Sequence, residues 1–104
     1  MRPSFDASFR VAGKVAAVYD TRLFATQFRI RDILIEAAAE SDRYSNSVIV
    51  SLYHDDVALG DKLKYGDYVV VRGKICGIYS SATNRYTTML RAVTVEKKNP
   101  PEEL

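Results

Sequence analysis

Hydrophobic and polar side chains alternate along the first part of the chain. Between residues 8 and 19 the odd positions are mostly apolar, whereas Arg10 and Lys14 occupy even positions. A period of two predicts a β-strand with one buried face. Gly13 falls on the apolar face, where a missing side chain permits a bend. We therefore expect a first strand over residues 8–19, bent at Gly13.

A second alternating stretch begins near Leu23, after a tight connection at residues 20–22, and continues to Arg31. The apolar positions then shift by one residue at 33–35, which predicts a bulge before the strand continues. Residues 36–40 prefer helix by propensity. We expect an extended strand end here, followed by a mobile loop at 41–46.

Residues 47–53 predict a third strand, and residues 55–63 are the most helix-like part of the chain. Asp55 is a suitable N-cap for that helix. Three apolar residues of the helix are placed to close one end of a barrel: Val57, Leu59 and Leu63. Gly60 makes the helix short or irregular.

The chain is organised around residues 62–74, in which a turn at 65–67 leads into a strand. Val69, Val71 and Ile75 alternate there with polar and basic positions, and Gly73 permits a bend on the apolar face. A turn at 80–84 leads to a partner strand at 85–95. From Tyr68 to Val95 there are four basic residues and no carboxylate, so this is a basic hairpin that carries tyrosines.

Two strands, a loop, a strand, a short helix and a hairpin follow one another along the chain. This is the order of an all-β, five-stranded OB-fold barrel with a short helix between strands three and four. Another small barrel or a sandwich is the alternative, because element order does not fix closure. We divide the 104 residues into an N-terminal arm (1–7), one OB-fold domain (8–96) and a short C-terminal tail (97–104).

Three segments resemble bacterial and phage single-stranded DNA-binding proteins. Residues 64–74 resemble that family's entry into its fourth strand, residues 84–88 (Asn-Arg-Tyr-Thr-Thr) its fifth strand, and residues 47–53 its third. The resemblance covers residues 8–95 and implies an OB fold that binds single-stranded DNA. Cellular members end in a long linker and an acidic tip. Here Pro100 and Pro101 follow the last strand closely, so the resemblance is to a short, tail-less relative.

The charge is segregated along the chain, although the formal net charge is only +2. Residues 7–31 hold five basic residues and one carboxylate. Together with the hairpin, these segments hold nine basic residues and one carboxylate. Residues 32–67 hold eight acids and three bases. Such segregation can present one positive surface to a polyanion.

Single-stranded nucleic acid requires cations along the phosphate path and flat surfaces for the bases. The candidate cations lie on the predicted outer faces: Arg10, Lys14, Arg29, Arg31, Arg72, Lys74, Arg85 and Arg91. For each of them, a solvated surface role is the alternative.

The resemblance implies base stacking by Tyr53 and Tyr86. It also implies stacking by Tyr79 if the hairpin of this chain, which is shorter, aligns with that of the family. Arg43 and Tyr44 would supply a cation and a ring from the loop. Half-buried packing is the alternative for the strand tyrosines. The phenylalanines are expected in the core: Phe9, Phe24 and Phe28.

Catalytic and metal chemistry have little support in the sequence. Cys76 is the only cysteine, which excludes a disulfide or a cysteine zinc cluster within one chain. His54, Asp55 and Asp56 are adjacent and cannot converge well on one ion. We expect no enzyme, metal or cofactor, no membrane span, and a cytoplasmic location.

We therefore hypothesise a largely sequence-independent single-stranded DNA-binding protein of replication, recombination or repair. It would act as a homo-oligomer, a dimer or a tetramer, and could contact replication proteins. One alternative is an OB-fold module that docks a protein within a replication or phage assembly. The other is an RNA-binding OB domain, because nothing in the sequence indicates whether the 2′-hydroxyl that distinguishes RNA from DNA is recognised.

Overall fold

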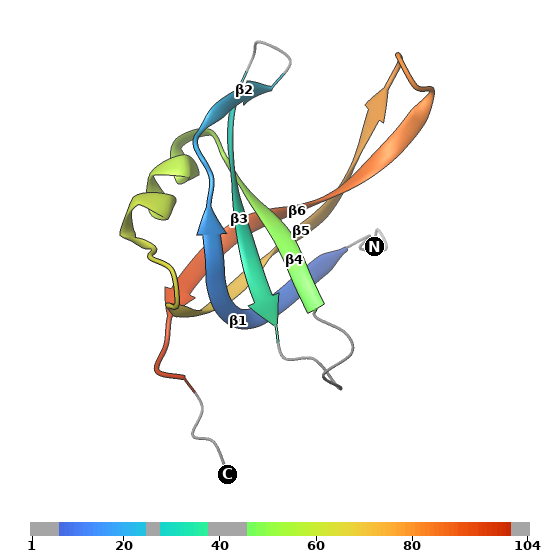
Figure 1. The fold of residues 1–104 in the computed structure, drawn as a ribbon. Helices are drawn as coiled ribbons and strands as arrows, with labels where there is room; N and C mark the ends of the chain where they lie inside the picture. The colour runs from blue at the N-terminus through green and yellow to red at the C-terminus, as the bar shows by residue number, and fades with distance from the viewer. Residues whose placement is uncertain (1–6, 25–27, 38–45, 101–104) are drawn as a thin grey trace, which may run out of the picture.

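The computed structural model describes residues 7–24, 28–37 and 46–100. These residues form six strands and one 3₁₀-helix (Figure 1). The elements are β1 (Ser8–Val18), β2 (Arg22–Phe24), β3 (Phe28–Ala37), β4 (Asn46–Tyr53), η1 (His54–Lys62), β5 (Tyr68–Ser80) and β6 (Arg85–Lys97). No helix in this part of the chain is long and apolar enough to cross a membrane.

The strands close into a barrel. They are ordered β1-β5-β6-β4-β3-β2, and an additional pairing of β1 with β3 completes a five-strand ring with β2 outside it. The 3₁₀-helix lies between β4 and β5, and β5 and β6 extend beyond the ring as a long hairpin (Figure 1). The predicted OB-fold barrel is confirmed, with one more strand than expected.

Two glycines allow β1 and β5 to curl around the barrel. At Gly13, β1 pairs with both β5 and β3, and a Cβ there would overlap the carbonyl oxygen of Glu36. At Gly73 the pairing of β5 with β6 shifts by one residue, and a Cβ would overlap the carbonyl oxygen of Arg91. Both predicted bends are confirmed, and each glycine is needed for close approach of two backbones.

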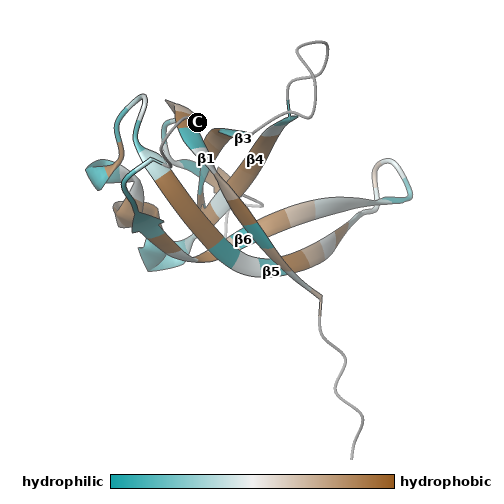
Figure 2. Cartoon of the chain, turned by 90° about the horizontal axis from the view of Figure 1, so that it is seen from below, coloured by the Kyte–Doolittle hydropathy of each residue, from teal (hydrophilic) through white to brown (hydrophobic). Residues whose placement is uncertain are grey.

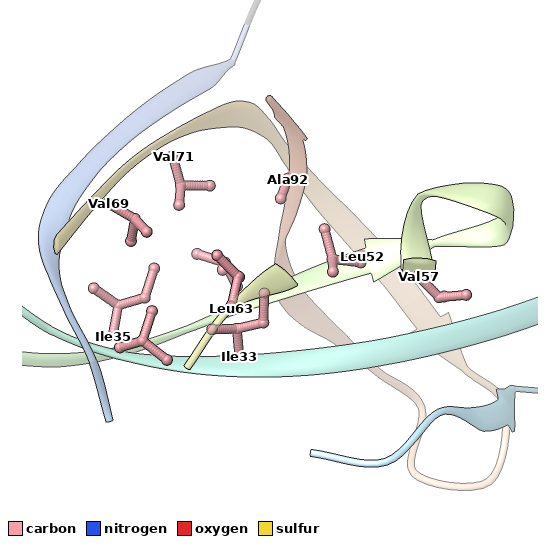
Figure 3. Close-up of a cluster of buried hydrophobic side chains, with 10 residues drawn as sticks. Ile33, Ile35, Leu52, Val57, Leu63, Val69, Val71 and Ala92 are labelled. Atoms are coloured by element: carbon pink, nitrogen blue, oxygen red, sulfur yellow. The ribbon is translucent and has the colours of Figure 1, made fainter. Parts of the chain in front are cut away.

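The core is formed by the inward side chains of β1, β3, β4, β5 and β6. Those drawn in Figure 3 include Ile33, Ile35, Leu52, Val57, Leu63, Val69, Val71 and Ala92. Leu59 packs against this core only partly buried, so the apolar residues predicted to close the barrel all contact it. Ile75 was expected on the apolar face, but it is 41% exposed because it lies on the hairpin beyond the ring. The turn at the hairpin tip is hydrophilic (Figure 2).

The expected second strand is in fact two strands. Residues Arg22–Phe24 and Phe28–Ala37 pair as an antiparallel hairpin, with Leu23 opposite Arg29 and Phe24 opposite Phe28. The connecting residues are Ala-Thr-Gln, which contain none of the residues that mark a turn in a sequence. The continuous alternation therefore concealed the hairpin.

The predicted bulge is absent from β3, and the nearby shift in register lies in its partner strand β1. β3 pairs with β4 without a shift from Ile30 to Ala37. The irregularity lies in β1, between Val15 and Ala17, opposite Ile35 and Leu34. The strand does continue through residues 33–35, as expected.

The predicted helix is present as the 3₁₀-helix His54–Lys62, but Asp55 is not its cap. The N-cap is Tyr53, which makes no side-chain capping hydrogen bond. Arg31 holds the helix instead, because its Nη1 donates to Asp61 Oδ1 at 2.7 Å and to the carbonyl oxygen of Val57 at 3.3 Å.

Arg31 was predicted to lie on the outer face, and this placement was wrong. Its side chain is only 17% exposed, and its Nε also donates to the carbonyl oxygen of Tyr19 at 2.9 Å. Arg31 shares the inward face of β3 with Ile33 and Ile35, where it packs beside Gly60. Since three elements meet on this guanidinium, its evident role is to join η1 to the barrel.

Candidate nucleic-acid interface

A groove separates the outer face of β3 and β4 from the long β5–β6 hairpin. β6 pairs with β4 only at Ser51 and Arg91 and then diverges from it (Figure 1). The space between them is about 970 Å³. Its walls are formed mainly by Asp32, Ile49, Ser51, Ile78, Met89 and Leu90. Most of these walls are apolar, as the faces of bases require.

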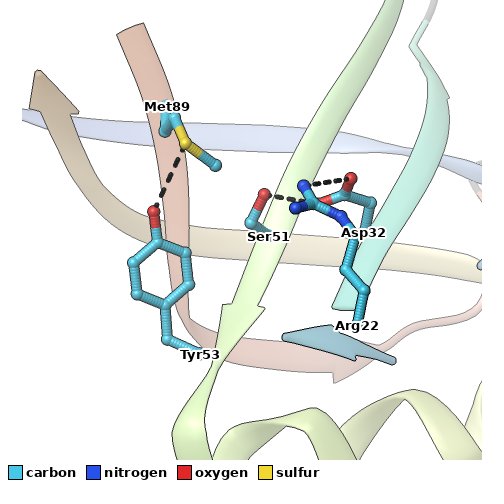
Figure 4. A network of polar contacts seen from close by, with 5 residues as sticks. All are labelled: Arg22, Asp32, Ser51, Tyr53 and Met89. Atoms are coloured by element: carbon cyan, nitrogen blue, oxygen red, sulfur yellow. Dashed lines mark hydrogen bonds and ion pairs between the residues drawn. The ribbon is translucent and has the colours of Figure 1, made fainter. Parts of the chain in front are cut away.

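A polar network lies in this groove. Ser51 Oγ donates to Asp32 Oδ1 at 2.7 Å, and Arg22 Nη2 donates to Asp32 Oδ2 at 3.4 Å (Figure 4). Ser51 is buried, whereas the Asp32 side chain stays 22% exposed. None of these three residues was predicted. The one signal in the sequence is a carboxylate at position 32, directly before the apolar run Ile33, Leu34 and Ile35.

Tyr53 is the last residue of β4, two positions after Ser51, and is 7% exposed. The Arg91 guanidinium lies over its ring, 5.2 Å from the centroid, and its hydroxyl donates to Met89 Sδ at 3.6 Å (Figure 4). Burial raises the pKa of Tyr53, and nearby Cys76 adds to this while Arg91 opposes it. The structure thus places this predicted stacking residue within packed side chains, and its role in binding stays a prediction.

Beside Tyr53 lies an aromatic shelf formed by Phe28, Tyr53 and His54. Phe28 is 5.5 Å from Tyr53 and 5.2 Å from His54 between ring centroids, and His54 is exposed. Phe28 was expected in the core but is outside it, because it sits at the end of the β2–β3 hairpin. Phe9 does pack against the core, and the side chain of Phe24 lies outside the described residues.

His54 has a φ of 55°, a left-handed conformation that is uncommon outside glycine and is often found at functional sites. Sequence reasoning considered His54 only as a metal ligand. Within the described residues, no three His, Cys, Asp or Glu side chains gather closely enough to hold a metal ion. Its ring instead packs against Phe28 and Tyr53 and stays exposed.

The far end of the hairpin carries two exposed tyrosines. Tyr79 and Tyr86 face each other across the strands with ring centroids 5.1 Å apart, and they are 50% and 75% exposed. The Tyr79 hydroxyl donates to Asn84 Oδ1, which holds the ring against the turn. Arg85 is exposed beside them. These three residues were predicted separately, and the structure places them close together and exposed.

Several predicted cations stand opposite one another on adjacent strands. Arg10 pairs in register with Arg72, and Lys74 pairs with Arg91. Like charges directly opposite are unfavourable in a sheet. No ion pair to any of these four side chains is found within residues 7–24, 28–37 and 46–100. A bound polyanion would remove that repulsion.

The remaining predicted cations lie on the same strands. Lys14 is exposed on β1, opposite Tyr68. Arg29 is exposed and pairs with Asp55 at 3.3 Å, a surface ion pair that an anion can displace. Arg43 and Tyr44 lie outside the described residues, so their predicted role remains a proposal.

The fold is similar to that of several solved structures. Mitochondrial single-stranded DNA-binding protein Rim1 from S. cerevisiae matches with a TM-score of 0.74 and 13% identity, over 95% of this chain and 100% of that one. The N-terminal domain of PriB from Thermoanaerobacter tencongensis, described as dimeric, matches with a TM-score of 0.67 and 12% identity, over 90% and 98%. Single-stranded DNA-binding protein SSBb of Mycobacterium smegmatis matches with a TM-score of 0.64 and 19% identity, over 95% of this chain and 100% of that one.

At these identities the likeness establishes the fold alone. No curated protein matches the sequence. The family model described as "Domain of unknown function (DUF3127)" matches residues 10–96. The chain therefore belongs to the DUF3127 family, and its fold is an OB barrel of the kind found in single-stranded DNA-binding proteins.

Proposed function

We propose that this protein binds single-stranded DNA with little dependence on base sequence, and that it protects or presents single strands during replication, recombination or repair. One observation carries the proposal: two opposed cations, Lys74 and Arg91, lead to the wall of an apolar groove. Lys74, Arg91 and Ser51 are successive partners in register across β5, β6 and β4. This row therefore runs from the positive outer face to the groove wall.

The groove suits a single strand. Its apolar walls can contact base faces, and stacking of a base on an aromatic side chain contributes about 1–3 kcal/mol for any base. Tyr79 lines the groove, and the exposed ring of Tyr86 packs beside it. The cations of β1 and β5 would meet the phosphates, which makes the affinity depend on salt.

The solved structures with this fold support the same proposal. Two of those described above are named as single-stranded DNA-binding proteins, from a yeast mitochondrion and from a bacterium. Each matches 95% of this chain, but their sequence identities to it are only 13% and 19%. They therefore support the class of ligand and leave its cellular role to experiment.

We further propose that the protein acts as a homo-oligomer. Ile75 and Val93 are 41% and 48% exposed on β5 and β6, beyond what the barrel core covers. Burial of such side chains between copies is a common driving force for association. Light scattering across a concentration series should give a dimer or a tetramer, and a monomer at all concentrations would contradict this.

A second candidate function is docking of a protein segment in the same groove. The observation in its favour is that Ile49, at the groove wall, and Leu23, on the outer strand, are exposed apolar side chains. A groove of this kind can bury a hydrophobic peptide as well as bases.

Fluorescence anisotropy with labelled oligo-dT, oligo-rU and duplex DNA of equal length tests the proposal. We expect oligo-dT to bind more tightly than duplex and to lose affinity steeply as salt rises. Equal affinity for oligo-rU would favour the RNA-binding alternative. Absence of binding to every nucleic acid would overturn the proposal and leave the protein-docking function.

A further inference from the structure

The wall of the groove holds a carboxylate, although the neighbouring strands carry cations. Asp32 lies there between Ser51 and Arg22 (Figure 4). A phosphate placed against this carboxylate would be repelled, even with Arg22 offsetting part of its charge. If a single strand occupies the groove, its bases must therefore face Asp32 and its phosphates must face away.

The Asp32 carboxylate retains unused acceptor positions. An ionised carboxylate offers about four lone-pair sites, two on each oxygen. Ser51 Oγ uses one site on Oδ1 and the guanidinium of Arg22 uses one on Oδ2. One site on each oxygen remains, and the side chain is partly exposed to the groove. Because Ser51 is buried and fixes Oδ1, the two free acceptors have a defined direction.

Two adjacent acceptors fit one nucleobase better than the others. The Watson–Crick edge of guanine presents two neighbouring donors, the N1–H and the 2-amino group. Adenine and cytosine present one amino donor beside a ring-nitrogen acceptor, and thymine presents one N–H between two carbonyl oxygens. A carboxylate can pair with both donors of guanine, but it is repelled by the carbonyls of thymine.

We propose that Asp32, positioned by Ser51 and Arg22, selects guanine within the groove. This selection rests on the proposed single-strand binding and adds a base preference at one position to otherwise sequence-tolerant contacts. Asp32 would act as the base reader, and Ser51 as the residue that positions it.

The test uses dT oligomers that carry one central dG, one central deoxyinosine or no substitution, bound to the wild-type protein. A bidentate base contact predicts that the dG oligomer binds about 5- to 150-fold more tightly than plain dT. Inosine lacks only the 2-amino group and should lose most of this advantage. A 7-deazaguanine oligomer keeps the same Watson–Crick edge and should retain it.

Asp32→Asn should abolish the preference for guanine while it keeps or raises the affinity for dT. Ser51→Ala should weaken the same preference, and it provides a second variant if Asp32→Asn does not fold. Asp56→Asn, which removes a carboxylate of η1 away from the groove, is the matched control and should leave the preference unchanged.

Equal binding of the dG, inosine and dT oligomers by the wild-type protein would overturn the guanine selection and leave single-strand binding intact. A guanine preference that persists in Asp32→Asn would also overturn it. Absence of binding to all oligomers would overturn both the selection and the proposed function.

Discussion

The guanidinium of Arg91 covers the ring of Tyr53 where the last hairpin leaves the barrel. This contact joins β6 to β4 beside the only position at which those strands pair. Arg91 Nε is buried and has no hydrogen-bond partner within the described residues. A desolvated cation–π pair of this kind contributes about 2 kcal/mol. The pair therefore stabilises the base of the hairpin.

Tyr53→Ala should lower the free energy of unfolding by about 3–5 kcal/mol, because it removes a buried ring and leaves a cavity. Tyr53→Phe keeps the ring under Arg91 and should cost far less. Thermal melting and oligo-dT affinity should be measured on both variants. Loss of binding by Tyr53→Ala with unchanged melting would show that the ring stacks on a base instead of supporting the hairpin.

Tyr79 and Tyr86 should contact the ligand directly, since both rings are exposed. Tyr86→Ala should weaken oligo-dT binding by about 1–3 kcal/mol with little change in melting temperature. Tyr65→Ala is the matched control, because Tyr65 is 84% exposed in the turn before β5. Equal loss of affinity in the two variants would remove the hairpin tip from the binding path.

Arg72 and Lys74 should each contact a phosphate. Replacing both with glutamine should flatten the slope of log affinity against log salt by about 1.4, the value for two contacts with a single strand. The control is the pair Lys62→Gln and Lys64→Gln, at the end of η1 and in the acidic segment. An unchanged slope in the Arg72 and Lys74 variant would contradict the proposed phosphate path.

Stability should fall at acidic pH through Asp67. Its carboxylate accepts the backbone N–H of Lys64 at 2.9 Å and pairs with Lys97 at 3.2 Å. These contacts, the backbone hydrogen bond first, lower the pKa of Asp67 from its ordinary value of 3.8. A lowered pKa gives stability that is present above pH 3.8 and lost as the pH falls through the folded-state value.

Urea unfolding of wild type and Asp67→Asn between pH 2 and pH 7 checks this expectation. The variant should be less stable than wild type at neutral pH, and the difference should shrink below pH 3.8. A constant difference in stability between the two proteins across this range would show that ionisation of Asp67 does not contribute to stability.

The barrel could be predicted because its signals are local. Alternation identifies Val69 and Val71 as core residues, and glycines mark the close crossings at Gly13 and Gly73. The β2–β3 hairpin could not be predicted, because its turn lacks glycine, proline or asparagine and its alternation is unbroken. Glycine and proline are the strongest local signals of a turn in a sequence, and neither occurs there.

The kinds of residue at the candidate site could be predicted better than their positions in space. Alternation indicated the exposed positions of the cations, which hold for Arg10, Lys14, Arg72, Lys74 and Arg85. Arg91 packs over Tyr53 instead, and the contact between Tyr79 and Tyr86 was not predicted. Arg31 was misplaced, because alternation cannot tell which face of a strand is capped by a helix. The pairing of Asp32 with Ser51 depends on the register between β3 and β4, which no single strand reveals.

Backbone amide NMR during a titration with oligo-dT tests most directly whether a single strand lies in the groove. A single strand in the groove should give saturable shifts in Ser47–Ser51 of β4, in Ile78 and Met89 of the hairpin, and in Arg72 and Lys74. Tyr65 and Asp67, in the turn before β5, should not shift. Shifts confined to that turn, or the absence of any shift at saturating oligo-dT, would contradict the account.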